Sequence, residues 1–118
     1  VIYYDTGTKL RFHYNPYDSN PSTVSTASSN SHPINEWHHV VAVNDENDAA
    51  AGGKLYVNTG LEGTAERAIA MNGNLFYGMQ NGNTQASNCI IAQSRIYSKA
   101  LTAEEVTQNY DATKSRFE

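Results

Sequence analysis

The sequence predicts an all-β fold, a two-sheet antiparallel sandwich that forms one domain over residues 1–118 and carries one short C-terminal helix. Three observations support this. Short runs of β-branched and aromatic residues alternate with turn residues along most of the chain. Only 17% of the residues are charged, while Tyr, Asn, Ser and Thr are abundant, which is typical of strands joined by polar turns. A length of 118 residues suffices for one hydrophobic core.

The N-terminal part predicts a β-hairpin and a long loop. Residues 1–4 and 9–14 are strand-like and flank a polar turn that contains Gly7. In the second run Leu10, Phe12 and Tyr14 share one face. Residues 18–35, rich in Ser, Thr and Asn, predict a surface loop with a short edge strand near residues 23–26.

The strongest strand signal covers residues 37–44, where both faces are largely apolar. One face carries Trp37, His39, Val41 and Val43, and the other carries His38, Val40 and Ala42. This pattern predicts a central strand that is buried on both sides. A polar turn over residues 45–53 and a strand over residues 54–58 complete a second hairpin.

Three more strands are predicted over residues 67–70, 75–77 and 89–97. Cys89, the only cysteine, lies at the start of an apolar run and is expected to be a small buried side chain.

The clearest local signal is a helix over residues 102–114. Thr102 and Glu105 have the spacing of a capping box, in which each side chain accepts a hydrogen bond from the other residue's backbone N–H. Leu101 and Val106 occupy the positions of a hydrophobic staple, which predicts that the helix packs on the sandwich.

The order of these motifs resembles the laminin-G-like branch of the concanavalin-A-like lectin/glucanase superfamily. The sequence WHHVV at residues 37–41 is followed by LYVN at residues 55–58 and by RIYSKALT at residues 95–102. The resemblance covers residues 37 to about 110 and implies a jelly-roll sandwich. Residues 101–117 look like laminin-G-like modules at the ends of tailed-phage structural proteins, which implies a virion surface protein.

The chain departs from the family pattern in three places. Thr59 separates Asn58 from Gly60, and Ala92 and Gln93 stand where an acidic pair is common. Few strands precede Trp37, so some N-terminal strands of such domains are expected to be missing. Sheet edges left open in this way favour pairing with another molecule, so we expect a multimer or lattice subunit.

Composition and motifs argue against several functions. The net charge is -4 without a basic cluster, which disfavours nucleic-acid binding, and no apolar run has membrane-spanning length. Glucanases of the superfamily use a Glu-x-Asp-x-x-Glu strand, whereas residues 46–48 are Glu-Asn-Asp and residue 51 is Ala. We therefore expect no enzymatic activity.

Two sets of side chains are candidate binding residues. The acidic turn offers hard oxygen ligands for calcium, an ion that laminin-G-like domains often hold at a rim loop. Aromatic and amide side chains on or beside loops are suited to sugar rings and hydroxyls. The calcium candidates are Asp45, Glu46 and Asp48, and the glycan-binding candidates are Tyr17, Tyr77, Asn81 and Asn83.

Two functional hypotheses follow. The first is a structural, decoration or adhesion module on a phage virion surface, with other virion subunits, copies of itself and cell-surface glycans as partners. The alternative is an extracellular carbohydrate-binding module of a secreted bacterial adhesin or carbohydrate-active enzyme.

Overall fold

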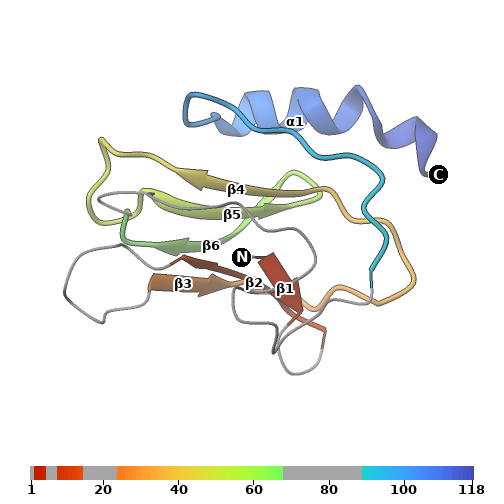
Figure 1. The fold of residues 1–118 in the computed structure, drawn as a ribbon, viewed down its shortest axis with the longest axis horizontal. Coiled ribbons are helices and arrows are strands. Elements are labelled where there is room, and N and C mark those ends of the chain that lie inside the picture. The colour runs from red at the N-terminus through yellow and green to blue at the C-terminus, as the bar shows by residue number, and fades with distance from the viewer. Residues whose placement is uncertain (1, 5–7, 15–23, 68–88) are drawn as a thin grey trace.

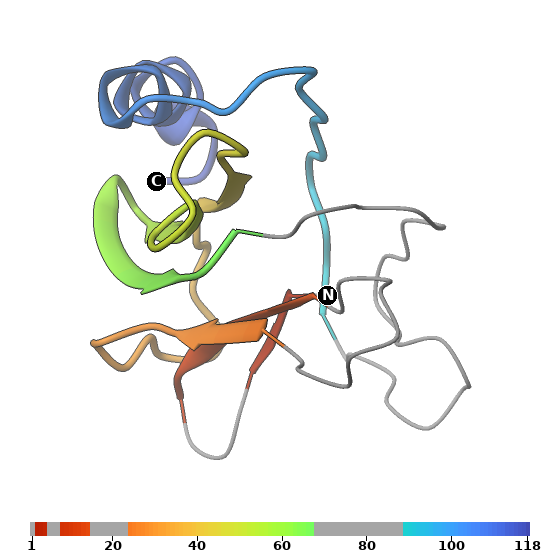
Figure 2. The ribbon, with the colours of Figure 1, turned by 90° about the vertical axis from the view of Figure 1, so that its left-hand side faces the viewer.

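The computed structural model describes residues 2–4, 8–14, 24–67 and 89–118, which form three layers. Two antiparallel three-stranded sheets lie face to face, and a helix covers the outer face of the second sheet (Figures 1 and 2). The first sheet contains β1 (Ile2–Tyr4), β2 (Leu10–Tyr14) and β3 (Val24–Ala27) in that order. The second contains β4 (Val40–Asn44), β5 (Gly53–Val57) and β6 (Gly60–Ala65). The helix α1 (Ala103–Asp111) is followed by a short 3-10 helix, η1 (Lys114–Arg116).

This arrangement confirms a mostly β fold with antiparallel sheets and one short C-terminal helix. Both described sheets are simple meanders, in which each strand pairs with its neighbour in sequence. The jelly-roll connectivity expected from the sequence therefore stays a prediction. Within the described ranges, no helix is long and apolar enough to cross a membrane.

One hydrophobic core lies between the two sheets. Leu10 and Phe12 of β2 pack against Leu55 and Val57 of β5. The partly buried Val40 and Ala42 of β4 join them. Side chains of a strand alternate between its faces, so the alternation predicted for residues 9–14 and 37–44 is confirmed for these residues.

A second core lies between the second sheet and α1. Val43 and Tyr56 face the helix and contact Leu101 and Val106, with Val41 packed beside them. Val106 is fully buried. The second sheet is thus covered on both faces, which explains why its strands carry apolar residues at consecutive positions.

The start of α1 confirms the predicted capping box. The backbone N–H of Glu105 donates to Thr102 Oγ1 over 3.3 Å, and the backbone N–H of Thr102 donates to Glu105 Oε2 over 3.0 Å. These bonds satisfy N–H groups that the helix itself cannot pair.

The strand predicted over residues 37–44 is shorter and lies elsewhere in the sheet than expected. It begins at Val40, and β5, not β4, is the middle strand among those described. The Trp37 side chain is 49% exposed, and its ring centroid lies 5.2 Å from that of Phe117. Trp37 is therefore held by the C-terminal end of the chain instead of by a sheet.

The strand predicted over residues 89–97 is wrong. This segment passes along the molecule toward the start of α1 without pairing with any described strand (Figure 1). Cys89 is exposed, contrary to expectation, and Ile90 is 81% exposed. β propensity produces a strand only where a neighbour takes up its backbone hydrogen bonds, and the described strands provide none here.

The strand predicted over residues 75–77 lies wholly outside the described residues, and the strand predicted over residues 67–70 lies mostly outside them. The edge strand near residues 23–26 is confirmed as β3, and the N-terminal hairpin is confirmed as β1 and β2. Strand β6 was not predicted, because its sequence GLEGTA contains two glycines, which weaken a strand pattern.

The turn between β5 and β6 is strained at Thr59. The two-residue loop has φ of 47° at Asn58 and 81° at Thr59. Two positive φ angles characterise a type I′ turn, which favours Asn-Gly because glycine has no Cβ to clash with the backbone. A β-branched residue in this region is a conformational outlier.

Replacing Thr59 with Gly should stabilise the protein. We expect the free energy of unfolding to rise by about 1 kcal/mol as the strain is relieved. Urea denaturation measures this change. Thr64→Gly, at a position where β6 pairs with Lys54 of β5, is the matched control and should lower the free energy of unfolding by roughly 0.5–1 kcal/mol. Equal losses in both variants would show that Thr59 is not strained.

Candidate functional site

In the acidic turn between β4 and β5, carboxylates accept hydrogen bonds from backbone N–H groups of the same turn. Asp45 Oδ1 accepts from the backbone N–H of Asn47 over 3.0 Å, and Asp48 Oδ1 accepts from that of Ala51 over 3.0 Å. Lys54 Nζ lies 3.9 Å from Asp48 Oδ2. Bonds of this type shape a tight turn without any ligand.

The same turn is the predicted calcium site. The exposed Glu46 contributes its carbonyl oxygen as acceptor to the Arg67 guanidinium. In the part of the chain that the structure describes, no three His, Cys, Asp or Glu side chains group to hold a metal ion. Calcium binding by Asp45, Glu46 and Asp48 stays a prediction, to be tested by calorimetry with calcium.

The predicted glycan-binding residues lie outside the described residues. They are Tyr17, Tyr77, Asn81 and Asn83. Their part in sugar binding stays a prediction.

A buried polar cluster joins the two sheets at one edge. The ladder between β5 and β6 shifts register after Leu55, so that Glu62 is left as the extra residue of a β-bulge. Its Oε2 lies 3.0 Å from His32 Nε2 and accepts from the backbone N–H of Asn30 over 3.1 Å. The bulge thus directs Glu62 to the loop that follows β3.

The contacts of Glu62 favour its charged form. Burial alone raises the pKa of this carboxyl, but the hydrogen bonds from His32 and from the Asn30 backbone outweigh it, so the pKa is lowered overall. A lowered pKa in the folded state stabilises the fold above the unfolded pKa near 4.5, and this stabilisation is lost as the pH falls through the folded pKa.

Glu62→Gln should therefore destabilise the protein in a pH-dependent way. At pH 7 we expect the free energy of unfolding to fall by about 1–2 kcal/mol, because a charge-assisted hydrogen bond is lost. Below pH 4.5 the difference from the wild type should shrink. Chemical denaturation across pH 3–7 tests this, with the exposed Glu46→Gln as control. A difference in the free energy of unfolding that does not change with pH would contradict a role of the Glu62 charge.

His39 lies between β4 and the C-terminal helix. Burial, and then the positive charge of Arg95, lower its pKa, so it is held in the neutral form. Its ring centroid lies 5.8 Å from that of Tyr110 at an interplanar angle of 61°, an edge-to-face contact. These features give His39 a packing role.

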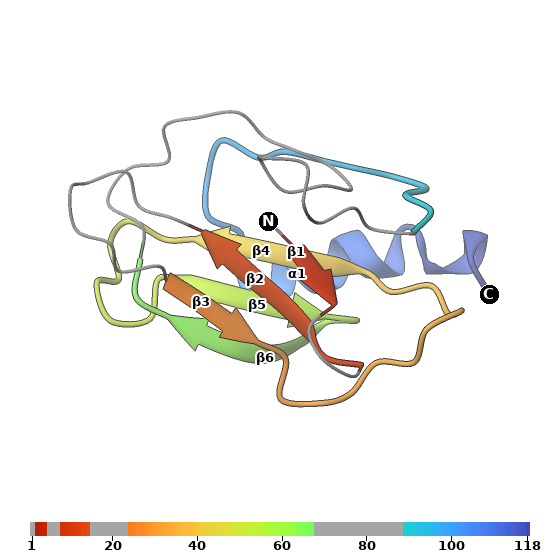
Figure 3. The ribbon, with the colours of Figure 1, turned by 60° about the horizontal axis from the view of Figure 1, so that its bottom comes forward.

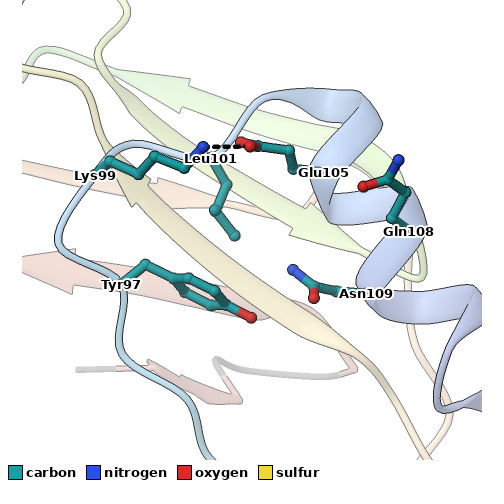
Figure 4. A pocket seen from close by; sticks show the side chains of 6 residues that line it. All are labelled: Tyr97, Lys99, Leu101, Glu105, Gln108 and Asn109. Carbon is teal, nitrogen blue, oxygen red and sulfur yellow. Dashed lines mark hydrogen bonds and ion pairs between the residues drawn. The ribbon is translucent and has the colours of Figure 1, made fainter.

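An open cleft lies between the segment before α1 and the exposed face of α1. Its volume is about 170 Å³. The segment contributes Tyr97, Lys99 and Leu101, and α1 contributes Glu105, Gln108 and Asn109 (Figure 4).

The helical side of this cleft could have been found in the sequence from the spacing of its polar residues, although not from composition. Glu105, Gln108 and Asn109 are spaced i, i+3 and i+4, so they share one face of the helix. Which part of the chain covers that face depends on the path of residues 97–101, which sequence patterns do not give.

The fold defines a β-sandwich module of two antiparallel sheets with a helix packed on one of them. The family model of the concanavalin A-like lectin/glucanases superfamily matches residues 1–107, and the chain belongs to this superfamily. Membership indicates a carbohydrate-binding or adhesion-type module, in a superfamily that includes both enzymes and non-enzymes. No curated protein and no solved structure matches the chain.

Proposed function

We propose that this domain is a non-enzymatic adhesion module that binds glycans. The observation that carries the proposal is the superfamily match over residues 1–107, because this superfamily includes lectins. The superfamily also includes enzymes, so the proposal distinguishes binding of a sugar from its cleavage.

Two carboxylates that are held in their charged form favour binding over cleavage. Glycoside hydrolysis requires a carboxyl pair, one member of which has a raised pKa so that it can donate a proton. Glu62 is hydrogen-bonded to His32, and the pKa of Glu62 is lowered. The hydrogen bond from Lys99, and then that from the Thr102 backbone, lower the pKa of Glu105. Neither group is suited to act as a general acid near neutral pH.

We further propose a position on a phage virion surface, where the domain decorates the particle or attaches to cells. The support is the likeness of residues 101–117 to the ends of tailed-phage structural proteins. The alternative is a carbohydrate-binding module of a secreted bacterial adhesin or carbohydrate-active enzyme, which would be extracellular. Electron microscopy of the native particle, with the domain labelled, separates the two locations.

Contacts with further subunits or copies belong to the same proposal. The segment over residues 89–97 exposes Ile90, Ile91 and Ile96, and β4 lies at the edge of the described second sheet. An exposed strand edge and exposed apolar side chains both favour association. Sedimentation should show a species larger than the monomer, and a monodisperse monomer would contradict self-association.

Glycan binding is tested by applying the labelled domain to a glycan array and measuring hydrolysis of the bound glycans by mass spectrometry. We expect retention of a defined set of glycans without cleavage. A domain unfolded by urea is the control for nonspecific retention. Absence of binding would contradict the proposed function, and cleavage would contradict its non-enzymatic nature.

A further inference from the structure

We propose that the cleft between residues 97–101 and α1 is a subsite for one neutral pyranose ring of a glycan. This inference rests on the proposed glycan binding and assigns it a place in the structure. It uses other residues than the sequence-based candidates, because none of the described residues that line the cleft was among them.

The size of the cleft suits a single ring. Its volume of about 170 Å³ is below the roughly 300–1,000 Å³ of sites for drug-sized ligands. It is open to solvent, so that the remainder of a longer glycan could extend outward. The buried Leu101 lies at the cleft and provides an apolar contact between its polar walls.

Tyr97 provides the aromatic surface. Its side chain is 41% exposed, although a large aromatic side chain is usually well covered. Figure 4 shows the ring on the opposite side of the cleft from Gln108 and Asn109. Sugar rings present apolar C–H faces that pack on aromatic rings, so an accessible tyrosine beside polar groups is suited to them.

The helix provides directed polar groups. Arg95 donates to Asn109 Oδ1 over 3.2 Å, which fixes the amide. With the oxygen engaged, the amide N–H groups of Asn109 can donate to a sugar hydroxyl, and Figure 4 shows this nitrogen on the side of Leu101. The Gln108 amide adds a donor and an acceptor at the rim.

The charges at the cleft compensate each other, which favours an uncharged ligand. Lys99 and Glu105 form an ion pair within the lining. An anionic sugar would have to compete with Glu105 for Lys99, whereas a neutral ring can accept from the ammonium and donate to the carboxylate. This selects neutral pyranoses over sialic or uronic acids.

The helical wall of the cleft is rigid. Glu105 also closes the capping box with Thr102, and Val106 anchors α1 in the second core. A helix anchored in this way holds the backbone of its cleft residues in place without a ligand, which lowers the entropic cost of binding.

The test is a titration of the ¹⁵N-labelled 118-residue domain with galactose, glucose, mannose and N-acetylglucosamine, followed by NMR. At least one sugar should shift amide signals of Tyr97, Gln108 and Asn109. Shifts confined to other residues would overturn the assignment of the sugar to this cleft but leave the proposed glycan binding intact. Binding of oligosaccharides on the array without any monosaccharide shift would also overturn only the assignment to this cleft. No binding in either experiment would overturn both proposals.

Variants at Tyr97 make the test quantitative. Tyr97→Ala should weaken binding of the responding sugar about tenfold, because the stacking surface is lost. Tyr97→Phe keeps the ring and should bind within about threefold of the wild type. Leu61→Ala truncates an exposed side chain on β6, outside the cleft lining, and should leave affinity unchanged. An unchanged affinity of a folded Tyr97→Ala domain would overturn the assignment.

Discussion

Leu55→Ala is expected to lower the free energy of unfolding by about 3 kcal/mol, since it leaves a cavity in the core between the sheets. Leu55 has 0% exposure and lies in the middle strand of the second sheet, where it meets Leu10 and Phe12 of the first. A loss of this size is a large part of the 5–15 kcal/mol by which domains are typically stable. Urea denaturation followed by tryptophan fluorescence measures it.

The matched control is Leu61→Ala on the neighbouring strand β6. Leu61 is 51% exposed, so the same truncation removes little buried surface. We expect a change within about 0.5 kcal/mol. Similar losses for the two variants would contradict the position of the core between the sheets.

Gly63→Ala is expected to lower the free energy of unfolding by about 2–3 kcal/mol through overpacking. Thr26 and Ala27 of β3 come close to the backbone of β6 at this residue. Figure 3 shows that β3 crosses over β6. A Cβ at position 63 would lie 2.1 Å from Thr26 Oγ1 and 2.7 Å from the carbonyl oxygen of Ala27. The two sheets would have to separate at this edge.

Gly60→Ala is the control for Gly63→Ala. It lies on the same strand, where an added Cβ would come no closer than 3.5 Å to the carbonyl oxygen of Val57. Thermal unfolding followed by circular dichroism should show a reduced midpoint for Gly63→Ala and little change for Gly60→Ala. Equal midpoints for the two variants would contradict the close approach of β3 and β6.

Local signals were sufficient for several elements. The capping box of Thr102 and Glu105 involves residues three positions apart, and such bonds form whenever the helix forms. The faces of β2 and β4 follow from the two-residue period of a strand, so Leu10, Phe12 and Val43 are buried as predicted.

Strand predictions that depend on a pairing strand elsewhere in the chain failed. Residues 89–97 have strand-forming composition, but a strand exists only with a partner, and none of the described strands pairs with this segment. The same reason makes Cys89 exposed. Conversely, β6 was not predicted because its glycines hide the pattern, yet β5 pairs with it along its length.

The sequence by itself determined the class of this protein, the alternation that builds its cores and the capped helix, since each depends on residues a few positions apart. Only the tertiary structure decided the hydrogen bond between His32 and Glu62, which are 30 residues apart, and the cleft beside α1. The first depends on how β6 returns to the loop after β3, and the second depends on the path that residues 97–101 take beside α1. That path is set by the packing of whole layers, to which many residues contribute small energies, and no short motif encodes it.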